Sequence, residues 1–146
     1  MIEIKVDDRE IKELLKRILK KSNDMSPAMK DIADIMLDAV EKNFEEEGRP
    51  SWPPLSPSTI KERQRKGFWP GKILQREGTL AGSISEDHGP LYALVGTNIK
   101  YAPIHQFGGR SGKGHRARIP ARPFLSLTEE DKDGIVEVLR EFLDSL

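Results

Sequence analysis

The chain has 146 residues, a length that fits a single domain over residues 1–146 with one hydrophobic core. It contains no cysteine, which excludes disulfides and thiolate metal sites and suits a reducing cytoplasm. The N-terminus lacks the basic start and apolar run of a signal peptide, and no apolar stretch approaches the length of about 18 residues that spans a bilayer. We therefore expect a soluble protein without a membrane partner.

The net charge of zero conceals a strong segregation along the chain. Residues 1–50 carry 10 Lys and Arg against 13 Asp and Glu, a net of −3, and residues 127–146 carry 2 against 7, a net of −5. The middle, residues 51–126, carries 12 against 4, a net of +8. A basic middle between acidic ends has three candidate explanations: the opposite charges pair within the fold, they pair head to tail between subunits, or the basic segment contacts nucleic acid.

The first fifty residues predict a strand and two helices. Alternation at Ile2, Ile4 and Val6 is typical of a half-buried strand. Asp7 is the expected N-cap of a helix whose apolar stripe repeats at helical spacing and ends near residues 22–24. A second, long helix is predicted at about residues 27–47, with Ser26 as its cap and Gly48 in the left-handed position after its end.

The central segment predicts shorter elements. Four prolines within residues 49–57 exclude a regular helix or a central strand there. Ser56 and Pro57 then open a short basic helix that Gly67 ends. Residues 83–85 and 91–96 are expected to pair as a hairpin, and Pro103 to begin one helical turn.

The C-terminal part predicts a loop, a strand and a helix. Residues 108–118 are expected to form a flexible basic loop and residues 122–127 to return as a strand. Thr128 and Asp131 then cap an amphipathic helix at about residues 129–145. The order of elements predicts an α+β fold, in which a small antiparallel sheet packs against two or three amphipathic helices.

The sequence shows no catalytic constellation and no cofactor or metal motif. The three histidines, His88, His105 and His115, lack the neighbouring ligands that a zinc site has at helical spacing. His105 is expected to pack and hydrogen-bond beside Tyr101 and Phe107. No serine occupies a nucleophile-elbow context. We therefore expect neither enzyme activity nor a bound cofactor or metal.

Residues 108–118 superficially resemble a phosphate-binding loop, but the spacing does not fit. Gly108 precedes the Gly-Lys pair by three residues, whereas the phosphate loop needs four, and a glycine follows the lysine in place of Ser or Thr. What remains is a basic arm that consists of Arg110, Lys113, Arg116 and Arg118. An acidic subunit surface, DNA and plain solvent are its three candidate environments. DNA is the least favoured, because the segment lacks the aromatic side chains on which bases stack.

Four blocks of sequence occur in a characteristic order. They are the Trp-Pro-Pro-Leu-Ser-Pro-Ser-Thr stretch at 52–59, the Leu- and Gly-containing segment 73–84, the segment 95–109 that ends in Gln-Phe-Gly-Gly, and the Ile-Pro-Ala-Arg-Pro-Phe-Leu stretch at 119–125. By these blocks the chain resembles the Mu-like phage virion morphogenesis (tail completion) protein family over about residues 40–127.

The resemblance implies a structural protein of a phage or prophage that acts in tail completion, at the tail end that meets the head. It implies assembly in the bacterial host cytoplasm, a place in the virion tail, and other tail or head–tail connector proteins as partners. We further expect a homo-oligomer, such as a ring. The suspected interface residues are those typical of contact anchors: Trp52, Tyr101, Ile104, His105, Phe107, Arg122 and Phe124.

Two other functions remain as alternatives. A DNA-contacting accessory protein at the head–tail junction would use the +8 middle segment, and its binding to duplex DNA would weaken steeply with salt. A hydrolytic or toxin-like enzyme would need a buried cluster of titrating groups that the sequence does not show.

Overall fold

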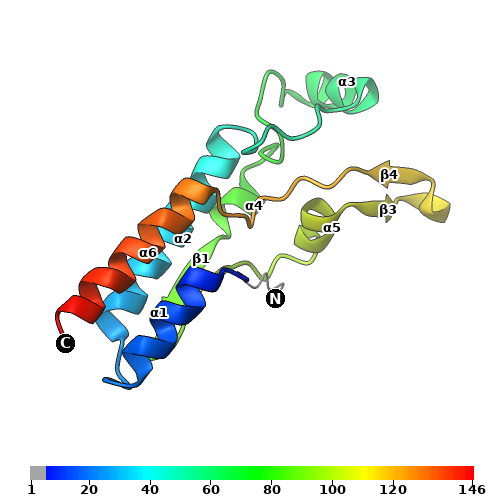
Figure 1. Cartoon of the computed structure of the whole chain (residues 1–146). Helices are drawn as coiled ribbons and strands as arrows, with labels where there is room; N and C mark the ends of the chain where they lie inside the picture. Colours follow the sequence, from blue (N-terminus) through cyan, green and yellow to red (C-terminus); the bar gives the residue numbers. More distant parts are fainter. Residues whose placement is uncertain (1–5) are drawn as a thin grey trace. The chain divides into compact units, whose positions relative to one another are not determined.

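The computed structural model describes residues 6–146, which form an α+β fold and confirm the predicted class (Figure 1). The elements, in chain order, are α1 (Arg9–Leu19), α2 (Ser26–Glu45), α3 (Pro57–Lys66), α4 (Thr79–Gly82), β1 (Ser85–His88), β2 (Ala93–Gly96), α5 (Ala102–Phe107), β3 (Gly109–Ser111), the 3-10 turn η1 (Lys113–His115), β4 (Ala117–Ile119) and α6 (Glu129–Asp144). The two helices predicted at about 27–47 and 129–145 are both present. The strand expected at Ile2–Val6 lies outside the described residues except for Val6.

The described residues divide into two compact units. The helical unit comprises residues 6–39, 85–96 and 127–146, and the central unit comprises residues 40–84 and 97–126. The expectation of a single domain over the whole chain stays a prediction.

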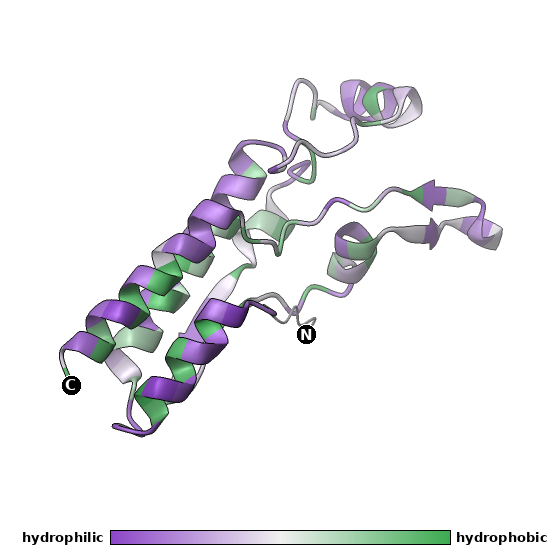
Figure 2. Cartoon of the chain, in the orientation of Figure 1, coloured by the Kyte–Doolittle hydropathy of each residue, from purple (hydrophilic) through white to green (hydrophobic). Residues whose placement is uncertain are grey.

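The helical unit contains an apolar core built by three helices. Its buried side chains come from α1, from Met25 and the first part of α2, and from α6, and α1 packs against α6. Figure 2 shows that α1 and α6 carry apolar residues on one side and polar residues on the other. The core residues are Ile11, Leu14, Ile18, Met25, Met29, Ile32, Ile135, Val136, Leu139 and Leu143. Burial of such stripes supplies most of the stability of helices of this length.

The starts of two helices in the helical unit differ from the prediction by one residue. Asp8, and not Asp7, caps α1, where its carboxylate accepts the N–H of Ile11 at 2.9 Å. Ser26, predicted as a cap, is the first residue of α2, and its N–H donates to the Asp24 carboxylate at 3.0 Å. At α6 the predicted capping box is confirmed: Thr128 and Asp131 exchange side-chain to backbone hydrogen bonds.

The end of α2 also differs from the prediction. Glu47, with φ of 56°, occupies the left-handed position after the helix, where the sequence predicted Gly48. The Gly48 N–H then reaches back to the carbonyl of Asn43 at 2.8 Å, which is the six-to-one bond of a Schellman ending. Gly48 is nevertheless required, because a Cβ there would lie 2.6 Å from the Pro50 carbonyl oxygen and from Trp52.

The predicted hairpin at residues 83–96 is confirmed with shifted bounds. β1 and β2 pair antiparallel from Ser85 opposite Gly96 to His88 opposite Ala93. The Pro90 carbonyl in the connecting turn accepts the N–H of Met25 at 2.8 Å, which fixes the turn against the start of α2.

In the central unit, α3 follows the sequence closely. The Ser56 hydroxyl accepts the N–H of Thr59, Pro57 opens the helix and Gly67, with φ of 82°, ends it. The short helix α5 includes the turn predicted from Pro103.

The prediction of an irregular loop at residues 108–118 is wrong in its local structure, because β3 and β4 pair there as a second antiparallel hairpin. Gly109 faces Ile119, Arg110 faces Arg118 and Ser111 faces Ala117. Each of these strands has only three residues, too few for an alternating pattern to predict a strand from the sequence. The flexibility of this segment stays a prediction.

Candidate functional site

The segment 120–126 of the central unit runs without a partner strand, so the predicted strand at 122–127 is wrong. Its backbone groups are bonded by side chains. The buried amide of Gln106 accepts the N–H groups of Phe124 and Leu125 at 3.1 and 2.9 Å, and it donates to the Leu125 carbonyl at 3.1 Å. The buried amide of Asn43 donates to the carbonyls of Phe124 and Ser126 at 2.7 and 3.0 Å.

The same segment anchors the aromatic centre of the unit. Phe44 stacks edge-on against Trp52 at 5.9 Å and lies 5.3 Å from the ring of Phe124, centroid to centroid. The Trp52 indole donates to the Pro123 carbonyl at 3.0 Å, and the Arg122 guanidinium donates to the carbonyls of Pro53 and Pro54, each at 2.9 Å. The proline-rich stretch and the segment 120–126 are thus joined by side chains from both.

This arrangement divides the suspected interface residues into two groups. Trp52, Arg122 and Phe124 are buried within the central unit and hold its core. Tyr101 and Phe107 are the exposed members, with 46% and 58% of their surface accessible, and Ile104 and His105 are half-buried. Sequence reasoning missed Asn43 and Gln106, although Asn43 follows Val40 by three residues on the apolar face of α2, where a polar residue indicates a buried hydrogen bond.

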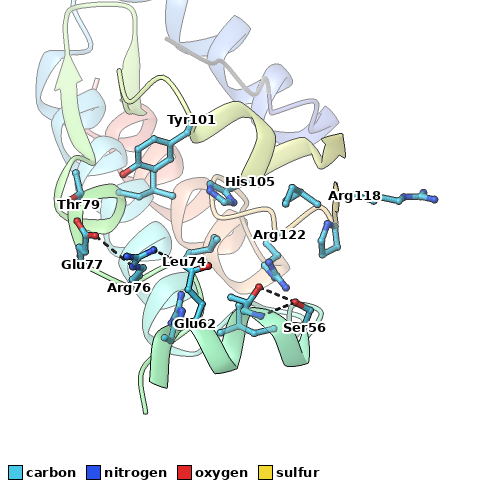
Figure 3. A pocket seen from close by; sticks show the side chains of 17 residues that line it. Ser56, Glu62, Leu74, Arg76, Glu77, Thr79, Tyr101, His105, Arg118 and Arg122 are labelled. Carbon is cyan, nitrogen blue, oxygen red and sulfur yellow. Dashed lines mark hydrogen bonds and ion pairs between the residues drawn. The ribbon is translucent and has the colours of Figure 1, made fainter. Parts of the chain in front are cut away.

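A cavity of about 510 Å³ lies in the central unit. It is formed by α3, the segment 74–80, the start of α5 and residues 118–122. In Figure 3, Arg76, His105 and Arg122 come from different parts of the chain and surround the same space. Six of the lining side chains carry charge: Glu62, Arg63, Arg76, Glu77, Arg118 and Arg122.

His105 packs against Tyr101, as predicted, with their rings edge-on at 5.9 Å. The predicted hydrogen bond is not formed at Nδ1, which is buried and lacks a partner among the described residues. Burial, with a smaller contribution from the nearby cation of Arg122, holds the pKa of His105 below its ordinary value. The imidazole is therefore neutral at pH 7.

The basic arm extends along the second hairpin. Arg110, Lys113, Arg116 and Arg118 are all exposed, and no carboxylate of the central unit lies within ion-pair distance of them. Arg110 and Arg118 are cross-strand partners, which places two like charges directly opposite each other. The hairpin thus gathers positive charge that the unit itself does not neutralise.

Two further findings bear on the kind of protein. Among residues 6–146, no group of three His, Cys, Asp or Glu side chains could hold a metal ion. Nor does that part of the chain contain a helix with the length and apolarity needed to cross a membrane.

Comparison with known proteins gives the family of this α+β chain. A family model described as the phage virion morphogenesis family matches residues 6–144, so the chain belongs to that family. It plays a structural role in phage morphogenesis.

Three curated relatives agree with this assignment. The chain is 40% identical to Mu-like prophage FluMu G protein 2 of Haemophilus influenzae, over 100% of this chain and 99% of that protein. It is 38% identical to the putative capsid assembly protein G of Escherichia phage Mu, over 75% of this chain and 74% of that protein. It is 36% identical to Mu-like prophage FluMu G protein 1 of Haemophilus influenzae, over 94% of this chain and 89% of that protein. No solved structure matches the chain significantly.

Proposed function

We propose that the chain is a structural subunit in tail completion, at the junction of tail and head, that works by self-association and by docking to other tail proteins. Family membership supports a morphogenesis role, and the assignment to the tail rests on the four sequence blocks. The name of the phage Mu relative refers to capsid assembly. A protein at the head–tail junction meets both structures. It would assemble in the host cytoplasm and remain in the virion tail.

Two unneutralised surfaces of opposite charge carry this proposal. The first is the basic arm on the β3–β4 hairpin. The second, which we call the acidic face, lies on α6 and consists of Glu130, Asp133, Glu137, Glu141 and Asp144. These five acids follow each other at intervals of three or four residues, so they lie on one side of the helix, and all five are exposed. Among the described residues of the helical unit, no cation forms an ion pair with them.

A basic arm and a separate acidic face on the same chain suit a head-to-tail interface between copies. In such a heterologous contact one surface of each copy meets a different surface of the next, and a closed rotation produces a ring. Complementary charge gives the contact its direction and raises the association rate. Tyr101 and Phe107 supply exposed aromatic surface in the same unit as the arm, and aromatic side chains are typical anchors of such contacts.

The test is the mass of the protein in solution at several concentrations, by light scattering after size exclusion, with electron microscopy to detect rings. We expect an oligomer at low salt that the double variant Arg110→Glu, Arg116→Glu disrupts. The matched control is Lys61→Glu, Arg65→Glu, which reverses two exposed cations on α3 and should leave the mass unchanged.

A charge-swap experiment identifies the partner surface. The variant Glu137→Lys, Glu141→Lys should also fail to self-associate, because two lysines on the acidic face repel the basic arm. Mixed with the arm variant, it should restore a complex through the reversed pair of surfaces. An oligomer that survives the arm variant would remove this proposal, as would a mixture that shows no complex.

A DNA-contacting role is the second candidate, supported by the same exposed cations of the hairpin. Each phosphate that the arm neutralises would contribute about −0.9 to the slope of log affinity against log salt concentration. Fluorescence anisotropy with a mixed-sequence duplex measures that slope. Binding that is lost in the arm variant but kept in the α3 control would favour DNA over an acidic protein surface.

A further inference from the structure

The charged lining of the cavity in the central unit is not balanced. Four guanidinium groups line it against two carboxylates. Both carboxylates are engaged with Arg76: Glu62 lies 3.0 Å from its Nη1 and Glu77 lies 3.6 Å from its Nε. Glu62 also pairs with Lys66 at 3.3 Å. Among the described residues, no carboxylate lies within ion-pair distance of the remaining guanidinium groups of the lining, although the charge of Glu47 acts on Arg63 from further away.

Arg63 and Arg122 are the buried members of this excess, each with 6% of its surface exposed. Their bonded donors go to neutral carbonyls: Arg63 Nη1 to Lys72 at 3.0 Å, and Arg122 to Pro53 and Pro54. Burial lowers the pKa of both guanidinium groups. The positive charge of Arg76 lowers the pKa of Arg63 further, and that of Arg63 lowers the pKa of Arg122 further. Positive charges that lie close together in a partly dehydrated site attract an anion strongly.

Two buried nitrogen atoms of the same lining have no hydrogen-bond partner among the described residues, Arg63 Nε and His105 Nδ1. Arg76 Nε also lacks a hydrogen bond, although it is within ion-pair distance of Glu77. Buried polar atoms are almost always bonded in native proteins, because an orphaned donor loses its water without compensation. A ligand that accepts hydrogen bonds would satisfy these atoms.

We infer that the cavity binds an organic carboxylate, held by Arg63 and His105 and attracted by Arg122. The two oxygens of a carboxylate accept a few hydrogen bonds from separate donors, which matches the single N–H of Arg63 Nε and an Nδ1–H of His105. Arg122 uses its Nε and Nη2 on the proline carbonyls, so it contributes positive charge and not the two-pronged contact that arginine makes with carboxylates and phosphates alike.

The rest of the cavity accommodates more than a bare anion. Its volume of about 510 Å³ falls within the range of small-molecule sites, roughly 300–1,000 Å³. Leu55, Leu74 and Ile119 add apolar surface to the lining, which would contact an aliphatic stem. A free small acid and the acidic side chain of another protein both present this chemistry.

The test is a titration of the full-length, ¹⁵N-labelled protein with sodium glutarate at constant ionic strength, followed by nuclear magnetic resonance. We expect saturable shifts of the amides at residues 63, 105 and 122. Arg63→Gln should weaken binding by roughly tenfold or more, because it removes a charge-assisted hydrogen bond. Arg65→Gln is the matched control, since it removes an exposed guanidinium from the same helix outside the cavity, and it should bind as the wild type does.

A second readout needs no variant and remains available if Arg63→Gln does not fold. Glutarate should raise the pKa of His105, measured from its imidazole resonances, because a bound carboxylate favours the protonated ring. The other charged groups of the lining, Glu62, Glu77 and the four arginines, are present with and without glutarate and do not cause the difference. An unchanged pKa at saturating glutarate would refute the inference.

Two further titrations separate the competing ligands. Sodium phosphate that binds more tightly than glutarate would refute the carboxylate assignment, and so would shifts that never saturate with either anion. A capped Ala-Glu-Ala peptide that binds as well as glutarate indicates a protein side chain as the natural ligand, whereas binding of glutarate alone indicates a free acid. The inference does not rest on self-association: a chain that stays monomeric and still binds glutarate keeps the cavity site and rejects the oligomer.

Discussion

Gln106→Leu should destabilise the central unit strongly, although leucine is apolar and of similar size. The Gln106 side chain is 5% exposed and makes three hydrogen bonds to the backbone of segment 120–126. The substitution leaves two N–H groups and one carbonyl without partners in the interior. At about 1 kcal/mol or somewhat more for each orphaned group, the free energy of unfolding should fall by roughly 3 to 5 kcal/mol. That is a large share of the roughly 5–15 kcal/mol of a typical domain.

Urea unfolding followed by tryptophan fluorescence is the appropriate assay. Both tryptophans, Trp52 and Trp69, lie in the central unit, so their emission reports on the unit that contains the substitution. The matched control is Gln64→Leu at an exposed site of α3, which should change the free energy of unfolding by no more than about 0.5 kcal/mol. A loss of under about 1 kcal/mol in Gln106→Leu would show that segment 120–126 is not held by this side chain.

Two further predictions concern the caps and the pH dependence. Thr128→Ala removes the hydroxyl of the capping box of α6 and should lower the free energy of unfolding by about 1 kcal/mol, measured by circular dichroism in urea. Thr128→Ser retains the hydroxyl and should retain the stability. Equal losses in both variants would contradict the role of the cap. The lowered pKa of His105 means that below about pH 6.5 the unfolded chain binds a proton that the folded chain does not. Stability of the central unit should therefore fall as the pH drops from about 6.5 towards the folded pKa. His105→Gln should flatten that decline, whereas His115→Gln, at an exposed site, should not. Identical profiles of unfolding free energy against pH in the wild type and His105→Gln would refute this prediction.

The elements that the sequence predicted correctly are those whose signals are local. Ser56 and Pro57 begin α3 and Gly67 ends it, all within a short stretch of sequence, and Thr128 with Asp131 begins α6. Caps act on backbone groups within one turn, so their chemistry is visible in a short stretch of sequence. The error at Asp7 is of the same local kind, because the neighbouring residues Asp7 and Asp8 both offer a carboxylate at the start of α1.

Segment 120–126 could not be predicted in this way. Its hydrogen bonds come from Gln106, about twenty residues earlier, and from Asn43, more than eighty residues earlier. The Pro-Phe-Leu pattern there is apolar and extended, as in a strand, but the partners that satisfy its backbone are side chains. No property of the segment itself distinguishes these two cases.

The sequence by itself determined the α+β class, the limits of the principal helices to within a few residues, the charge segregation and, through four blocks of residues, the family. Only the tertiary structure decided which suspected contact residues are buried, with Trp52 and Phe124 in the core and Tyr101 and Phe107 at the surface. It also brought Arg63, His105 and Arg122 around one cavity. The physical reason is that helix caps and turns depend on neighbours along the chain, whereas burial and the meeting of charges depend on which distant segments pack together.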